Sequence, residues 1–440
     1  MIFPKSNEFS APRYRIGNAW RAVGKNLGWM LASRGVLAVL SLFYLGIITR
    51  SLGVAGFGRF ALVAGAAQAL STLVAFQSWQ VVVQFGIGAA QADDEEALGR
   101  LFRGSLILDL SSAIIGAGLA AIILIIWSDQ FGIGPTLQRA ALIYAIVQVV
   151  TIRSTPLGIL RLSDRFSYAA LAESMTPVAR FVGAWVVLLV HPTVQGYLAA
   201  WGAAEVLTAV TYWILARKVG GWRLIRHGRG MKRLLAEHPG LLRFAVSTNA
   251  SSTLGLASKQ LPLLVVGAAL GPAAAGTFRL ASQIAQSLAK LSQLVARAAF
   301  PEVVRAVRQA EDDTVRRILS RTLMASAVTG TVIMVLVGVA GDPVLRLIGG
   351  RGFGHTFPVL MGMAAAGCID LATVGLDTVM TARGRAGTVF IVRATAVVST
   401  FAAAVWLVPQ FYAFGMALAV VAGSVTAAML LAAVTWRSLC

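Results

Sequence analysis

Long apolar runs separated by short polar segments fill almost the whole chain. An α-helix needs about 20 such residues to cross the hydrocarbon layer of a bilayer. Runs of this kind lie at residues 30–50, 60–85, 104–127, 139–158, 173–190, 194–215, 244–268, 276–299, 321–340, 356–380, 388–408 and 411–435. The pattern predicts an all-α integral membrane protein with about 12 transmembrane helices. The fourth and fifth runs are the least regular, because charged residues, Pro156 and Pro177 interrupt them.

Composition and charge support this class and indicate an orientation. Of the 440 residues, 57% are hydrophobic and 13% are charged, which is outside the range of ordinary soluble domains. A net charge of +20 would suggest nucleic-acid binding in a soluble protein. Here most of the 38 Lys and Arg fall in alternate connections, as in the cytoplasmic loops of membrane proteins. We therefore expect both termini in the cytoplasm, an N-terminal segment that is not cleaved, and no nucleic-acid partner.

The distribution of runs and charges predicts four segments. These are a cytoplasmic or interfacial N-terminal segment (1–29), an N-terminal six-helix lobe (30–216), a basic cytoplasmic linker (217–243) and a C-terminal six-helix lobe (244–440). The linker either lies against anionic headgroups through its apolar residues or serves only as a connection and topology signal. The apolar residues concerned are Trp222, Leu224, Ile225, Leu234 and Leu235.

An internal repeat relates the two predicted lobes. Residues 52–73 (LGVAGFGRFALVAGAAQALSTL) align without a gap on residues 270–291 (LGPAAAGTFRLASQIAQSLAKL), an offset of 218, with ten identities in 22 positions. Because each half has an even number of spans, both halves have the same orientation. Such halves are related by a pseudo-twofold axis along the membrane normal, an arrangement typical of transporters, with the substrate path between the halves.

The second copy of the repeat carries an unusual polar face. At about 100° per residue, six polar side chains fall within an arc of about 80° on one helix. These residues, here named the polar stripe, are Arg279, Gln283, Gln286, Lys290, Gln293 and Arg297. A charged side chain in the centre of a bilayer costs about 2.5–3.5 kcal/mol on insertion scales. We therefore expect the stripe to face an interior that is hydrated or contains anions.

Two interpretations remain open for the stripe. Arg279 and Arg297 lie near the helix ends and can extend to the membrane surface. Lys290 is in mid-span, and either faces the lumen or forms a buried ion pair. The acids available to it are Asp109, Glu205, Asp370 and Asp377. The last two are seven residues apart and share a helix face, and Arg393 is an equally good partner for them.

Further cations lie in or near the spans. Lys259 precedes Pro262 in the seventh run, and Arg34 lies near the inner end of the first. A proline-broken helix in a membrane is tolerated where it lines a cavity or packs within protein. The charge predicted within the membrane is net positive, which favours an anionic substrate.

The chain carries no catalytic or metal-ligand motif. Its four histidines have no ligand spacing, and no phosphate loop or G-x-S-x-G elbow occurs. We expect no enzymatic activity, no metal and no cofactor, and transport driven by an ion gradient, the membrane potential or the substrate gradient.

Two segments resemble a known family: SRGVLAVLSLFYLGIITRSLGVAGFGRFAL (33–62) and LGPAAAGTFRLASQIAQSLAKLSQLVARAAFPEV (270–303). They are similar to polysaccharide transporters, and most of all to O-antigen or exopolysaccharide repeat-unit flippases. These belong to the superfamily (MOP) of MATE multidrug exporters and lipid II flippases. The resemblance implies a MATE-like fold in the bacterial inner membrane. It also implies translocation of undecaprenyl-diphosphate-linked oligosaccharides by alternating access through a cationic central cavity.

The resemblance also implies roles for particular residues. The diphosphate would be held by Lys290, Lys259, Arg279 and Arg34, and sugar hydroxyls by Gln286, Gln283 and Gln293. Asp370 and Asp377 would serve in ion coupling or as counter-ions, together with Arg393. Expected partners are the lipid-linked oligosaccharide, membrane lipids and enzymes of the same pathway, with the chain acting as a monomer. The alternatives are an ion-coupled drug or metabolite antiporter of the same fold, and a membrane polymerase or ligase acting on the same lipid-linked sugars.

Overall fold

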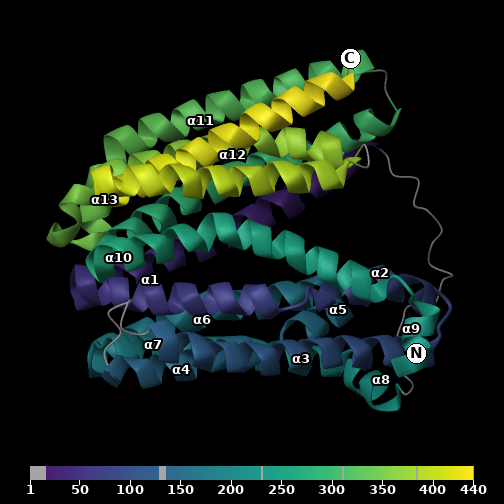
Figure 1. Ribbon diagram of the computed structural model, residues 1–440. Coiled ribbons are helices and arrows are strands. Elements are labelled where there is room, and N and C mark those ends of the chain that lie inside the picture. Colours follow the sequence, from purple (N-terminus) through teal and green to yellow (C-terminus); the bar gives the residue numbers. More distant parts are fainter. Residues whose placement is uncertain (1–15, 128–134, 229–230, 310–311, 383–384, 440) are drawn as a thin grey trace. The chain divides into compact units, whose positions relative to one another are not determined.

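The structure is a computed structural model that describes residues 16–127, 135–228, 231–309, 312–382 and 385–439. At residues 16–36, 38, 127, 135–136, 231–232, 289–309, 312–319, 321–322, 351, 378, 382, 386 and 438–439 it describes the backbone only. Apart from short non-helical connections, the secondary structure of the described residues consists entirely of helices (Figure 1). These are α1 (Ile16–Val74), α2 (Ser78–Gln91), α3 (Glu95–Trp127), α4 (Pro135–Val150), α5 (Ser154–Leu162), α6 (Phe166–Val190), α7 (Val194–Lys218), α8 (Gly221–His227), α9 (Met231–Glu237), α10 (Leu241–Gln309), α11 (Asp312–Gly349), the 3₁₀ helix η2 (Arg351–Thr356), α12 (Phe357–Ala382) and α13 (Ala386–Leu439).

Nine helical stretches within the described residues are long and apolar enough to cross a membrane. Three of them, Val39–Gln91, Leu241–Leu288 and Gly387–Arg437, have 53, 48 and 51 residues. At 1.5 Å per residue each is more than twice the length of a single crossing. Each also contains a residue with non-helical backbone angles: Gly53, Gly271 and Tyr412 respectively. The number of twelve crossings stays a prediction.

The repeat predicted from sequence is present in the backbone. Gly53 (φ 66°, ψ −177°) and Gly271 (φ 83°, ψ 177°) adopt the same bend, and they are 218 residues apart. This region of backbone conformation is almost restricted to glycine, which explains why the LG pair occurs in both copies. The sequence analysis had predicted a loop between two spans at each of these positions. In the structure the two helices follow each other directly and are joined by the bend.

The two copies of the repeat also touch each other, in a reciprocal way. A Cβ atom at Gly58 would lie 1.7 Å from the carbonyl oxygen of Pro272, and one at Gly276 would lie 2.5 Å from the carbonyl oxygen of Val54. Gly276 corresponds to Gly58 and Pro272 corresponds to Val54 under the same offset of 218. The two contacts are therefore related by a local pseudo-twofold axis that passes between Gly58 and Gly276. The helix backbones can come this close because glycine has no side chain beyond a hydrogen atom.

The chain divides into two compact units. The first consists of residues 1–44, 66–128 and 134–253, and the second of residues 45–65, 129–133 and 254–440. In the first unit α3 packs on α4, α6 packs on α7, and the short helix α5 packs on α2. In the second, α12 packs on α11 and α13, with Leu376, Val379, Val392 and Leu431 in a buried cluster. The predicted segment boundaries at residues 217 and 243 stay a prediction.

The linker is docked on the first unit rather than spread on a surface. Leu224 and Ile225 of α8 are buried against α3 and α5, and Leu234 of α9 is buried in a neighbouring cluster. The prediction that these three side chains face lipid headgroups is therefore wrong: they complete the apolar core at the start of α3. Trp222 and Leu235 are exposed. Ion pairs of α3 with α8 and α9 hold the linker in place: Glu95–Arg223 (2.5 Å) and Arg100–Glu237 (2.9 Å).

Candidate functional site

Two membrane helices of the first unit are interrupted. The backbone is non-helical at residues 75–77, between α1 and α2, and at residues 151–153, between α4 and α5. In a membrane, irregular backbone is tolerated only where protein or a hydrated cavity satisfies its polar groups. Asn249 donates from Nδ2 to the carbonyls of Leu73 (3.3 Å) and Ala75 (2.7 Å), and Trp213 donates from Nε1 to that of Ile152 (3.1 Å).

Asp109 of α3 joins the two helix starts that follow these breaks. Its carboxylate accepts hydrogen bonds from the Ser78 hydroxyl (2.5 Å), the Thr155 hydroxyl (2.6 Å) and the Thr155 backbone N–H (3.0 Å). Ser78 begins α2, and Thr155 is the second residue of α5. A carboxylate is favoured there because a helix N-terminus has unpaired N–H groups and positive potential. Asp109 thus has a structural role that binds the two broken helices together.

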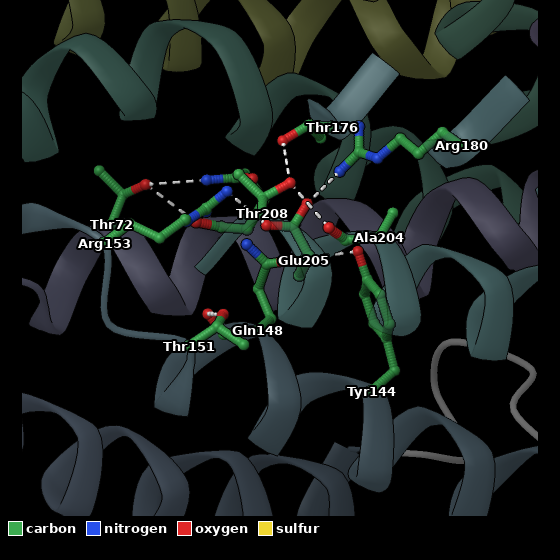
Figure 2. A network of polar contacts seen from close by, with 11 residues as sticks. Thr72, Tyr144, Gln148, Thr151, Arg153, Thr176, Arg180, Ala204, Glu205 and Thr208 are labelled. Atoms are coloured by element: carbon green, nitrogen blue, oxygen red, sulfur yellow. Dashed lines mark hydrogen bonds and ion pairs between the residues drawn. The ribbon is translucent and has the colours of Figure 1, made fainter. Parts of the chain in front are cut away.

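A second buried acid, Glu205 of α7, lies between two guanidinium groups (Figure 2). Arg153 reaches its Oε2 and Arg180 reaches its Oε1, each at 2.6 Å. The Glu205 side chain is 2% exposed, and those of Arg153 and Arg180 are 30% and 21% exposed. An unpaired charge at this depth would be costly, and the triad instead has a net charge of +1.

A cavity of about 330 Å³ lies beside this triad, inside the first unit. Its polar lining comes from both helix breaks and from α3, α6 and α7: Ser71, Gln77, Asp109, Ser112, Gln148, Thr151, Arg153, Ser154, Glu173, Thr176, Thr208 and Tyr212. Gln148 is buried; the Tyr144 hydroxyl donates to its Oε1 (3.2 Å), and its Nε2 has no hydrogen-bond partner. The cavity can hold a small polar ligand or about ten water molecules, since a water in the liquid occupies about 30 Å³.

The Arg153–Glu205–Arg180 triad was not predicted from sequence, where most Lys and Arg were assigned to the connections between spans. Arg180 instead lies well inside α6. A signal for the pair was present: α6 and α7 are joined by the short turn 191–193, and Arg180 and Glu205 lie nearly equal numbers of residues from it. Residues at equal distances from a helical hairpin turn lie at the same depth. Thr176 and Thr208 obey the same relation and are hydrogen-bonded at 2.9 Å.

The second unit contains most of the residues predicted for the substrate. Arg279 donates to Gln260 Oε1 (3.3 Å), Gln286 donates to the Ser282 hydroxyl (3.0 Å), and Gln283 is half-buried. Lys259 is exposed. The side chains of Lys290, Gln293, Arg297 and Arg34 lie outside the described residues, so their contacts stay predictions. The backbone of α10 is helical without interruption from residue 272 to residue 309, which keeps the polar stripe in register.

The remaining predicted charges form one cluster between α12 and α13. Arg393 contacts Asp377 at 2.5 Å, the Thr373 hydroxyl at 2.8 Å and Asp370 at 3.7 Å. The sequence left Lys290 and Arg393 open as partners for these aspartates. The structure shows the contacts with Arg393, and pairing with Lys290 stays a prediction because that side chain is not described. Asp109 and Glu205 likewise have partners of their own within the first unit.

Comparison with known proteins identifies relatives of this chain. The profile of the polysaccharide biosynthesis protein family matches residues 23–307. The inner membrane protein YghQ of Escherichia coli (strain K12) is 26% identical over 344 residues, which cover 78% of this chain and 96% of that protein.

Solved structures share the fold. An inward-facing multidrug resistance MATE family transporter of the MOP superfamily superposes with a TM-score of 0.73 at 16% identity, over 92% of this chain and 94% of that one. The lipid II flippase MurJ, in an inward closed conformation, gives 0.70 at 13% identity, over 91% and 86%. The prediction of an all-α membrane fold of the MATE type is confirmed, and the structures that share it are transporters and flippases, not enzymes. The chain is a multi-pass membrane protein and belongs to the polysaccharide biosynthesis protein family.

Proposed function

We propose that this protein is a flippase for lipid-linked oligosaccharides. Its substrate is an undecaprenyl-diphosphate-linked repeat unit of O-antigen, capsule or exopolysaccharide, which it moves across the bacterial inner membrane by alternating access through a cationic central cavity. Both termini lie in the cytoplasm. The observation that carries the proposal is the polar stripe of α10, a row of cations and amides on one face of the uninterrupted helical segment 272–309.

The charges of the described residues support an anionic substrate. Of the four acids considered as partners for Lys290, Asp109 and Glu205 are engaged in the first unit by helix starts and by Arg153 and Arg180, whereas Asp370 and Asp377 share Arg393 in the second unit. A substrate diphosphate is then the natural counter-ion for Lys290, with Lys259, Arg279 and Arg34 assisting. In this proposal the amides Gln283, Gln286 and Gln293 bind sugar hydroxyls, and Asp370 and Asp377 are counter-ions of Arg393.

The experiment is translocation of undecaprenyl-diphosphate-linked oligosaccharide in proteoliposomes by wild type, Lys290→Ala and Lys290→Arg. We expect Lys290→Ala to lose most of the activity and Lys290→Arg to retain part of it, because a bidentate guanidinium still binds phosphate. Lys218→Ala, at the exposed end of α7, is the matched control. Full activity of Lys290→Ala at a normal protein level would remove this residue from the substrate site.

The antiporter alternative makes a different prediction in the same preparation. A cationic-drug antiporter of this fold would drive drug uptake into the vesicles in exchange for protons or sodium ions, and would leave the lipid-linked saccharide in its original leaflet. Lipid translocation without drug transport is the result that we expect.

A further inference from the structure

The cavity of the first unit is distinct from the polar stripe, and its lining is chemically mixed. Glu173 offers a carboxylate acceptor, Gln148 Nε2 is a buried donor without a partner, and Arg153 offers donors from a partly exposed guanidinium. The hydroxyls of Ser71 and Thr151 can both donate and accept. Donors and acceptors therefore converge from α1, the break before α5, α4 and α6.

The balance of charge argues against an ionic ligand. The cavity and the adjacent triad bring together two guanidinium groups, of Arg153 and Arg180, and three carboxylates, of Asp109, Glu173 and Glu205. The guanidinium of Arg161, against Trp79, brings the cations to three, which equals the number of carboxylates. A phosphate would therefore meet no excess of positive charge, and Arg153 already contacts Glu205. Asp109 is likewise occupied by three hydrogen-bond donors. Among the described residues no group of three His, Cys, Asp or Glu is arranged to hold a metal ion.

The size and the apolar part of the lining favour a ring-shaped neutral ligand. A volume of about 330 Å³ far exceeds a bare ion and lies at the lower end of the range for small-molecule pockets. Trp79 and Tyr212 are the aromatic residues other than Phe76 that line the cavity. Trp79 is fixed by a hydrogen bond from its Nε1 to Gln77 (3.1 Å) and by the guanidinium of Arg161, 4.1 Å from its ring centre. A pyranose has the matching properties, with hydroxyls around its edge and C–H groups on its faces.

We infer that the cavity formed by Gln148, Arg153, Glu173, Trp79 and Tyr212 in the first unit is a subsite for a neutral sugar residue of the lipid-linked saccharide. This inference rests on the proposed function and deepens it: the diphosphate is bound by the stripe of α10, and sugar selectivity is set in the first unit. Gln148 donates through its free Nε2 to a sugar hydroxyl, and Glu173 accepts from another. Whichever way the amide of Gln148 is turned, one end is bound to Tyr144 and the other remains for the ligand.

The test compares three probes in proteoliposomes: undecaprenyl diphosphate without a sugar, with N-acetylglucosamine, and with galactose. The quantity measured is the translocation rate of each sugar-bearing lipid relative to the sugar-free lipid. We expect wild type to favour at least one sugar-bearing lipid, and Gln148→Leu to reduce that preference by about tenfold, the factor that corresponds to 1.4 kcal/mol. Glu173→Gln, at an exposed position, is the second variant and should reduce the preference without loss of folding. Gln138→Leu, on the same helix but outside the cavity, should leave it unchanged.

The outcomes separate the two proposals. If wild type moves none of the three lipids, the proposed function fails. If wild type moves them but the preference is absent, or is the same in Gln148→Leu and Glu173→Gln, the sugar subsite is overturned and the flippase function stands. If these two variants instead change the dependence of every rate on sodium ion or pH and leave the preference unchanged, the cavity takes a cation and the inference is wrong.

Discussion

The contact between the two copies of the repeat gives the sharpest test of the fold. Gly58→Ala would place a methyl carbon 1.7 Å from the carbonyl oxygen of Pro272, where carbon and oxygen require more than 3 Å. The backbones must separate by roughly 1.5 Å, because neither atom belongs to a flexible side chain. Overpacking of this kind costs typically 1–3 kcal/mol, and a backbone partner places this case at about 3 kcal/mol.

Part of that cost is offset, because alanine is favoured over glycine in a helix by about 0.5–1 kcal/mol. The net loss is about 2 kcal/mol for Gly58→Ala. It should be smaller for Gly276→Ala, whose Cβ would lie 2.5 Å from Val54 O. Gly118→Ala is the matched control: Gly118 is inside α3 with no atom within 4 Å of its Cβ position.

The assay is thermal unfolding of the purified protein in detergent, followed by tryptophan fluorescence. At about 2–4 °C per kcal/mol for a unit of 150–250 residues, Gly58→Ala should lower Tm by roughly 4–8 °C. Gly276→Ala should fall between it and wild type, and Gly118→Ala should equal or exceed wild type. A Tm for Gly58→Ala at or above that of Gly118→Ala would show that the two copies do not meet at these glycines.

Three further predictions concern the bends and the buried charges, each measured by the same unfolding assay. Gly53→Ala and Gly271→Ala should destabilise by about 1–3 kcal/mol and by similar amounts, since both positions have the same positive-φ conformation; a neutral effect at either would refute the shared bend. Glu205→Gln should lower the free energy of unfolding by about 3–5 kcal/mol, because two guanidinium groups lose their counter-charge. Its control is Glu95→Gln, in a half-exposed ion pair, which should lower it by less than about 1 kcal/mol. Equal losses would show that Glu205 is exposed to water. Arg393→Met keeps the length and apolar stem of the side chain but leaves two aspartates without their cation, and should also destabilise by about 3 kcal/mol or more; wild-type stability would show that those carboxylates are solvated or protonated.

Much of the fold was predictable because membrane helices can be recognised in a sequence by the length and composition of their apolar runs. The apolar runs at 173–190 and 194–215 correspond closely to α6 and α7, and the offset of 218 predicted a repeat whose glycine bends coincide. The errors lie at the breaks. The apolar run at 60–85 was interpreted as one span, yet the helix stops at Val74 and restarts at Ser78. Hydropathy cannot detect such a break when the flanking residues stay apolar and the freed backbone groups find partners elsewhere in the protein, as they do with Asn249.

The candidate sites were predictable only in part, for a different reason. A residue such as Lys259 can be assigned to a span and a face from periodicity alone. The partner of a charge depends on which helices are neighbours, and that information is absent from a single sequence except across a short turn. Arg180 and Glu205, on either side of the 191–193 turn, were within reach of such reasoning, as was Arg393 with Asp377 across the connection between α12 and α13. Asp109, which binds helices from distant parts of the chain, was not.

The pattern of pairing suggests why this family member can carry so many cations within the membrane. Asp109 and Glu205 are held in the first unit, at the N-termini of broken helices or by guanidinium groups, and Asp370 and Asp377 contact Arg393 in the second unit. These acids stabilise packing within a unit, where exchange of partners would expose an uncompensated charge at a cost of several kcal/mol. They are therefore poor candidates for release during each transport cycle. A charge that must be bound and released in every cycle is better supplied by the substrate itself, and in the function proposed above the diphosphate would bring that negative charge to Lys290 only while it is being transported.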